Sequence, residues 1–171
     1  MWQLRAAKKS ALAAMDSGHA PSNGLESAII ADLPPGNYTA IVRGVNDTTG
    51  VGLVEVYDLN NPGTVPSSIL RNISSRSLVL TGEDVMIGGF TVQGSENSTT
   101  RVIVRAIGPE LTRYGVQNVL TDPTLELHNA AGTSIASNDN WQTTVLGGII
   151  TKDQVMWSAI VKRNLDRFHY C

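Results

Sequence analysis

The chain has 171 residues, of which 42% are hydrophobic, and its formal net charge at pH 7 is −2. This length suits one domain, and the apolar content is too high for a disordered chain. The near-neutral charge argues against broad nucleic-acid binding. A membrane-spanning helix needs roughly 18 consecutive apolar residues, which this sequence lacks. The single cysteine, Cys171, excludes a disulfide framework within the chain.

Charge divides the chain into three segments. Residues 1–22 carry a net charge of +2, and residues 146–171 also carry +2. Residues 23–145 carry six arginines against twelve acids, which is a net charge of −6. We therefore expect an acidic folded domain, residues 23–145, between two basic flanks. The first flank, residues 1–22, is a helical lead with a linker, and the second, residues 146–171, is a C-terminal tail.

The first segment predicts a short helix. Residues 3–15 are rich in Ala, Leu, Arg and Lys, which favour helices, and Gly18 is a natural stop. A secretion signal is the alternative, because basic residues precede a short apolar run. That run is shorter than the roughly 7–15 residues of a signal-peptide core. We therefore expect no signal peptide in this chain.

The body, residues 23–145, reads as β-structure. Turn signals rich in Gly, Pro, Asn and Asp separate short runs in which apolar and polar residues alternate. We expect strands over 26–33, 38–43, 51–58, 77–80, 85–92, 101–107, 124–128 and 133–137. Strands of this number and spacing predict an all-β fold, an antiparallel β-sandwich that is jelly-roll-like. Pro109 predicts one helical turn over 108–114.

The tail, residues 146–171, has two interpretations. Thr151 and Gln154 have the spacing of a capping box, and apolar residues that follow can line one helical face. We expect a helix over 152–167, and a strand over 155–161 stays open as the alternative.

Glycines in the body suggest local constraints. Gly36 or Asn37 is expected in a tight turn before Tyr38. Gly50 opens a strand rather than a phosphate-binding helix, so we expect it to allow a bulge or a close backbone approach. The same interpretation holds for Gly88, inside another strand.

Two pairs of segments in the body resemble a known family. Residues 33–44, with Leu-Pro-Pro-Gly-Asn-Tyr, and 49–57 look like the closing half of bacterial pre-peptidase C-terminal (PPC)-like β-sandwich repeats. Residues 124–128 and 135–141 look like the opening half. The halves stand in reverse order here, as expected if a tandem array were cut inside one repeat. Trp2-Gln3 recurs as Trp141-Gln142, which agrees with an array.

The resemblance implies a structural hypothesis and a function. The opening half, residues 124–141, would pair with the closing half, residues 26–58, inside this chain, as in a circular permutant. Members of the family are generally non-catalytic modules of large secreted or surface proteins of environmental bacteria. The expected function is a structural or interaction module at the cell surface or outside the cell. The expected partners are neighbouring repeats, surface proteins or polysaccharide. A polysaccharide-binding accessory module, assisted by calcium, is the alternative, and a hydrolase the least favoured.

Catalytic arrangements find little support in the sequence. His128 could join Asp122 or Asp139 in a triad, but no nucleophile elbow accompanies it, and a residue on a sheet face is the favoured interpretation. Nominal carboxylate pairs are Glu55 with Glu126, and Glu83 with Asp84. Acids on strands and turns are ordinary, so we expect no enzyme.

One oxygen-rich sequence precedes Trp141. Asn138, Asp139 and Asn140 could contribute to a calcium site, with Asp32 or Asp47 from another loop, because calcium takes about six to eight oxygen ligands. The favoured alternative is a turn whose side chains bond their own backbone. No other cofactor is expected. Trp141 itself is interpreted as a buried residue rather than a platform for sugars.

Overall fold

The computed structural model describes residues 16–60, 68–70, 73–142 and 145–146. The helices predicted over 3–15 and 152–167 lie outside these residues. The described residues form strands and two short 3-10 helices: β1 Ser27–Leu33, β2 Gly36–Gly44, η1 Val45–Asp47, β3 Gly50–Asp58, β4 Ser68–Ile69, β5 Ile73–Val79, β6 Met86–Gly94, β7 Thr100–Ile107, η2 Pro109–Tyr114, β8 Pro123–Asn129, β9 Ser134–Asp139 and β10 Val145–Leu146. None of the described helices is long and apolar enough to cross a membrane.

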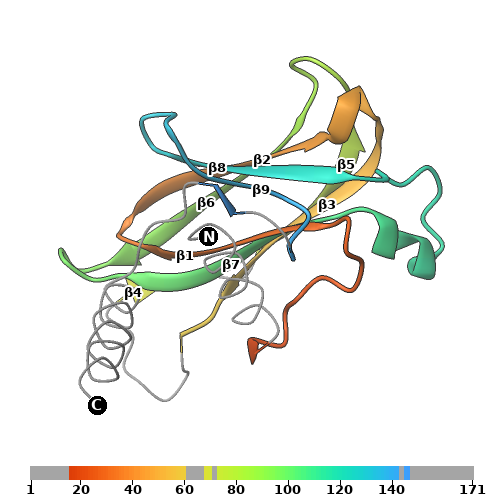
Figure 1. Cartoon of the computed structure of the whole chain (residues 1–171). Helices are drawn as coiled ribbons and strands as arrows, with labels where there is room; N and C mark the ends of the chain where they lie inside the picture. Colours follow the sequence, from red (N-terminus) through yellow and green to blue (C-terminus); the bar gives the residue numbers. More distant parts are fainter. Residues whose placement is uncertain (1–15, 61–67, 71–72, 143–144, 147–171) are drawn as a thin grey trace, which may run out of the picture.

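The strands form two facing sheets, and their pairings are antiparallel (Figure 1). The first sheet has the order β1-β7-β3-β5. The second has the order β10-β9-β8-β2-β6-β4. The predicted antiparallel β-sandwich is therefore confirmed, and consecutive strands cross repeatedly from one sheet to the other.

The predicted strands agree with the observed ones except at some boundaries. β5 begins at Ile73, four residues before the predicted segment, and β9 extends to Asp139. β4 and β10, of two residues each, were not predicted. The predicted helical turn is η2, where Pro109 stands in the first turn and Gly115 ends the helix with φ of 76°.

The two segments that resemble halves of a PPC-like repeat pair with each other. β8 lies beside β2, with Tyr38 opposite Asn129 and Gly44 opposite Pro123. This pairing within the chain confirms the predicted contact between the two segments. It places residues 79 (Gly44 and Pro123) to 91 (Tyr38 and Asn129) positions apart side by side at the centre of the second sheet.

The main core lies between the sheets and follows the alternation of the strands. Every second residue of the central strands points inward and is buried, as expected for a sandwich whose sheets each have one face in the core. These residues include Ile29, Ala31, Leu33, Tyr38, Ala40, Val42, Val54, Val56, Val102, Val104, Ala106, Leu125 and Leu127.

A second, smaller apolar cluster lies on the outer face of the first sheet. Ala28 of β1 and Ile103 of β7 point away from the main core and pack against Trp141. Partly buried neighbours are Ala20, Ile30, Tyr57 and Leu59. Trp141 is 5% exposed, which confirms that it is buried, although in this outer cluster and not between the sheets.

Two glycines allow close approaches, as predicted. A Cβ atom on Gly50 would lie 2.5 Å from the backbone nitrogen of Leu120, and one on Gly88 would lie 2.8 Å from a methyl group of Val54. Gly36 differs from the prediction. It is the first residue of β2, has no left-handed φ, and a Cβ there would make only ordinary contact with the Tyr38 ring at 3.7 Å. The prediction that Gly36 or Asn37 lies in the turn is therefore wrong, because the chain passes from β1 to β2 at Pro34 and Pro35.

Candidate functional site

The predicted calcium sequence is mostly strand. Asn138 and Asp139 end β9, and only Asn140, with φ of 66°, follows it. The predicted turn is therefore wrong for the first two residues. The buried Asn138 side chain accepts a hydrogen bond from the backbone N–H of Ala28, at 2.9 Å. That amide oxygen therefore joins β9 to β1.

Asp139 has a different acidic neighbour from those predicted. Asp32 is held by Arg101, whose Nε and Nη2 donate to its two carboxylate oxygens at 2.8 and 2.9 Å. The nearby acid is Asp122. Burial raises the pKa of the Asp122 carboxyl, and the charge of Asp139 raises it further. The Oδ1 atom of Asp122 is buried and accepts no hydrogen bond from a described residue.

These groups do not by themselves make a calcium site. The described residues contain no group of three or more His, Cys, Asp or Glu side chains that could hold a metal ion. Two carboxylates supply fewer than the roughly six to eight oxygens that calcium takes. Calcium binding at Asp139 therefore stays a prediction.

His128 lies on the outer face of the second sheet, as predicted. Its Nδ1 is 3.0 Å from the carbonyl oxygen of Gly132, and its Nε2 is 2.9 Å from Oε2 of Glu126. Both contacts raise the pKa of the imidazole, that with Gly132 more strongly. The ring therefore contacts Glu126, and neither Asp122 nor Asp139 completes the triad considered above.

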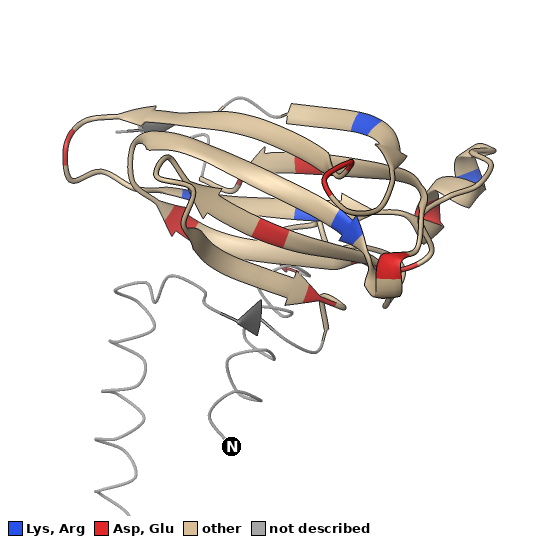
Figure 2. Cartoon of the chain, turned by 90° about the horizontal axis from the view of Figure 1, so that it is seen from above, with Lys and Arg blue, Asp and Glu red and all other residues tan. Residues whose placement is uncertain are grey.

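The structure places the two nominal carboxylate pairs in different settings. Glu55 points outward from the first sheet and Glu126 outward from the second, so the full sandwich separates them. Glu83 and Asp84 are exposed in the turn between β5 and β6. Acids and bases are interspersed over the described strands rather than gathered in one field (Figure 2).

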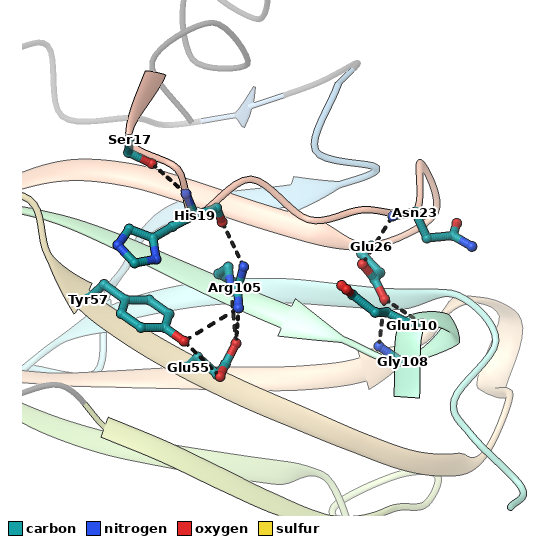
Figure 3. A network of polar contacts seen from close by, with 9 residues as sticks. All are labelled: Ser17, His19, Asn23, Glu26, Glu55, Tyr57, Arg105, Gly108 and Glu110. Carbon is teal, nitrogen blue, oxygen red and sulfur yellow. Dashed lines mark hydrogen bonds and ion pairs between the residues drawn. The ribbon is translucent and has the colours of Figure 1, made fainter. Parts of the chain in front are cut away.

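A largely enclosed ion pair joins the two central strands of the first sheet, β7 and β3. Arg105 of β7 and Glu55 of β3 stand directly opposite each other in the strand register. Arg105 Nε donates to Oε2 of Glu55 at 2.9 Å, and Nη2 also donates to that oxygen (Figure 3). The two side chains are only 16% and 12% exposed. This shielding makes the pair stronger than an exposed ion pair.

Neighbours hold that pair in place. Tyr57 donates its hydroxyl hydrogen to Oε1 of Glu55 at 2.9 Å, and Arg105 Nη1 donates to the carbonyl oxygen of His19 at 2.8 Å. The ring of His19 stacks on Tyr57 with centroids 4.1 Å apart. Burial, followed by the contact with Glu55, raises the pKa of Tyr57. Four side chains are thus fixed in one network on the outer face (Figure 3).

Glu26 is a fully buried carboxylate that directly precedes β1 of the first sheet. Its Oε1 accepts hydrogen bonds from the backbone N–H groups of Glu110, at 2.8 Å, and Gly108, at 3.3 Å (Figure 3). Its Oε2 accepts one from Asn23 at 3.4 Å. Burial raises the pKa of Glu26 despite these contacts. Glu26 therefore fixes the start of η2 against the turn that precedes β1.

η2 and the first sheet together enclose a groove of about 480 Å³, which we call the β3–η2 groove. Apolar side chains come from β3, β7 and the η2 region: Leu53, Ile107, Leu111 and Val116. Polar side chains include the network pair and groups from β5 and η2: Glu55, Arg105, Ser74, Arg76 and Glu110. Tyr114 also lines the groove and is 75% exposed.

Sequence reasoning missed both the network and the groove. In the sequence, Arg105 belongs to the predicted strand over 101–107 and Glu55 is considered only in a pair with Glu126. The available signal was an Arg and a Glu at outward positions of two predicted strands. Their contact depends on the register between β3 and β7, which lie about 50 residues apart.

The chain was compared with protein-family models, with curated proteins and with solved structures, and none of them matches it.

Proposed function

We propose that the chain is a non-catalytic structural or interaction module of a secreted or cell-surface repeat protein. The observation that supports this proposal is the pairing of β2 with β8. The order of the two halves in the sequence is the order expected from a shifted repeat, and the halves assemble into one sandwich. Such a unit would fold separately at each position of an array.

The junction between the halves is specific. Ser27 donates its hydroxyl hydrogen to the carbonyl oxygens of Pro123, at 2.7 Å, and Asn138, at 3.0 Å. The backbone N–H of Trp141 donates to the carbonyl oxygen of Glu26 at 2.8 Å, and its indole N–H donates to Asn23. These hydrogen bonds tie the start of β1 and the turn before it to the start of β8 and to the end of β9.

One edge of the first sheet offers a contact for neighbouring repeats. β5 is the last strand of that sheet, and five of its residues in succession, Ser74–Leu78, are exposed. Edge strands carry unpaired backbone groups that can pair with another chain. Adjacent modules would cover this edge in an array.

A tandem fusion of two copies tests the proposal. We expect each copy to keep the cooperative thermal transition of the single chain, with an equal or higher Tm, measured by circular dichroism. Small-angle scattering of the fusion should show two connected compact bodies. Loss of the transition in the fusion would contradict a modular role. Hydrolysis of chromogenic glycosides or esters that disappears in Glu55→Gln or His128→Gln would contradict the non-catalytic assignment.

Polysaccharide binding is the second candidate function, and the β3–η2 groove favours it. The groove combines an exposed aromatic side chain, Tyr114, with several polar groups. Calcium would assist if Asp139 is a ligand. In that case, millimolar calcium should raise the Tm, a chelator should reverse the rise, and Asp139→Ala should abolish it, since a ligand of the native state stabilises it. An unchanged Tm would mean that calcium does not stabilise the module.

A further inference from the structure

We propose that the β3–η2 groove binds a neutral sugar unit of a polysaccharide, with Tyr114 stacking on the sugar ring and Arg76 and Glu110 bonding its hydroxyl groups. This inference rests on the second proposed function, polysaccharide binding, and assigns it a site and a class of ligand. The volume of about 480 Å³ falls in the range of roughly 300–1,000 Å³ that is usual for small-ligand sites.

The floor of the groove is preorganised. Glu55 and Arg105 are bonded to each other, and Tyr57 and the His19 carbonyl use further hydrogen-bonding positions of the pair. Both charged side chains are mostly shielded from water. A ligand therefore meets a surface that does not have to rearrange, which lowers the free-energy cost of binding.

Two charged side chains that line the groove, Arg76 and Glu110, can form hydrogen bonds with a ligand. Arg76 is exposed on β5 and forms no hydrogen bond or ion pair with another described residue. The Glu110 carboxylate forms none either, since its contact with Glu26 is through its backbone N–H. Guanidinium groups only donate hydrogen bonds and carboxylates only accept them. A sugar hydroxyl does both, so it can be bonded by both groups.

Charge balance selects an uncharged ligand. The groove is lined by two arginines, Arg76 and Arg105, and by two glutamates, Glu55 and Glu110. The charges sum to zero, and one of each sign is already paired in the floor. A phosphate or a uronate would gain from Arg76 and be repelled by Glu110. A neutral sugar avoids this repulsion.

Tyr114 is an exposed aromatic residue on a fixed support. η2 is anchored by buried Leu111, begins at the backbone groups held by Glu26, and ends at Gly115. An aromatic ring with an apolar face and a polar edge suits the apolar face and hydroxylated rim of a sugar ring. Its 75% exposure means that stacking requires no displacement of other side chains.

The test is titration of the full chain with neutral and acidic oligosaccharides, followed by isothermal calorimetry and by backbone amide NMR. The neutral probes are cellotetraose, xylotetraose and mannotetraose, and the acidic probe is trigalacturonate. At least one neutral probe should bind and shift amides of β3, β5 and η2. Tyr114→Ala and Arg76→Gln should each raise its Kd about tenfold, the size of a strong contact in an interface.

Arg113→Gln is the matched control. Arg113 is an exposed arginine on η2, next to Tyr114, and does not line the groove. Its substitution should leave the Kd unchanged. The Tm of all three variants should match that of the parent chain, because the substituted side chains are exposed.

The outcomes separate the site from the function. If Tyr114→Ala and Arg76→Gln leave the Kd unchanged, the groove is not the binding site, and polysaccharide binding still stands. Binding of trigalacturonate alone would overturn the neutral class. No binding of any probe, neutral or acidic, at millimolar concentration would overturn both the site and the second function, while the structural module would stand.

Discussion

The two outer faces of the sandwich differ in how far other residues cover them. The outer face of the second sheet follows simple alternation, with Thr39, Glu126 and His128 toward solvent and apolar partners in the core. The outer face of the first sheet is largely covered by residues 19–23 and Trp141, and it encloses charged groups. Ile103 and Ile107 are buried there, although they occupy outward positions of β7.

The two faces therefore differ in how much a single polar side chain contributes to stability. A solvent-facing sheet surface tolerates amino-acid substitution, because its ion pairs are exposed and weak. A covered surface depends on each buried polar group having its partner. The Arg43 and Glu126 side chains, 3.8 Å apart and about two-fifths exposed, represent the first case, and Glu26 represents the second. Four predictions test this contrast.

Trp141→Ala should give the largest effect. The indole fills the outer cluster against Ala28 and Ile103 and donates to Asn23. We expect a loss of about 3–5 kcal/mol in the free energy of unfolding, as is usual for a buried Trp. Urea denaturation measures it. Ile87→Ala, on the exposed face of the second sheet, is the control and should change stability by less than about 0.5 kcal/mol. Similar losses for both would refute the contrast.

Glu26→Ala should be the next largest. The substitution leaves the N–H groups of Gly108, Glu110 and Asn23 without their acceptor in a buried place. We expect a loss of about 2–3 kcal/mol. Glu126→Ala on the opposite face, where the carboxylate is 41% exposed, should cost less than about 1 kcal/mol. The comparison fails if the two glutamates prove equally important in denaturation.

Asn138→Ala should weaken the junction between the two halves. It removes the acceptor of the Ala28 N–H, which is buried, and should cost about 1–2 kcal/mol. Hydrogen exchange measured by NMR should then show faster exchange for the Ala28 amide than in the parent chain. Ser137→Ala, on the neighbouring outward position of β9, is the control. Unchanged protection of Ala28 would mean that this hydrogen bond does not secure the junction.

His128→Gln should give the smallest effect, visible only as a pH dependence. The pKa of His128 is raised in the folded state, so protonation stabilises the fold. That contribution is complete below the imidazole's unfolded pKa, about 6.5, and is lost as pH rises through the raised value. The Tm of the parent chain should therefore fall more than that of the variant between about pH 6 and pH 8. Parallel curves would show that the histidine contributes nothing.

Much of the fold could be predicted because its signals are local. Alternation in residues 51–58 and 101–107 predicts strands, and Pro109 predicts the turn that became η2. The candidate site could not be predicted in the same way. Asn138 lies in a strand rather than a turn, because β9 pairs with β8, where Asn138 stands opposite Leu125. Its side chain is held by a backbone N–H 110 residues away. Glu26 is the first residue of the predicted strand over 26–33, and no local pattern indicates that it is fully buried.

The sequence by itself determined the strands, most of the turns and the sandwich class, because these depend on the nature of residues a few positions apart. It also indicated that residues 124–141 would pair with residues 26–58. Only the tertiary structure decided which polar groups meet, including Arg105 with Glu55 and Glu26 with η2. The physical reason is that strand register and the covering of one outer face place these groups within bonding distance. No local pattern records either of them.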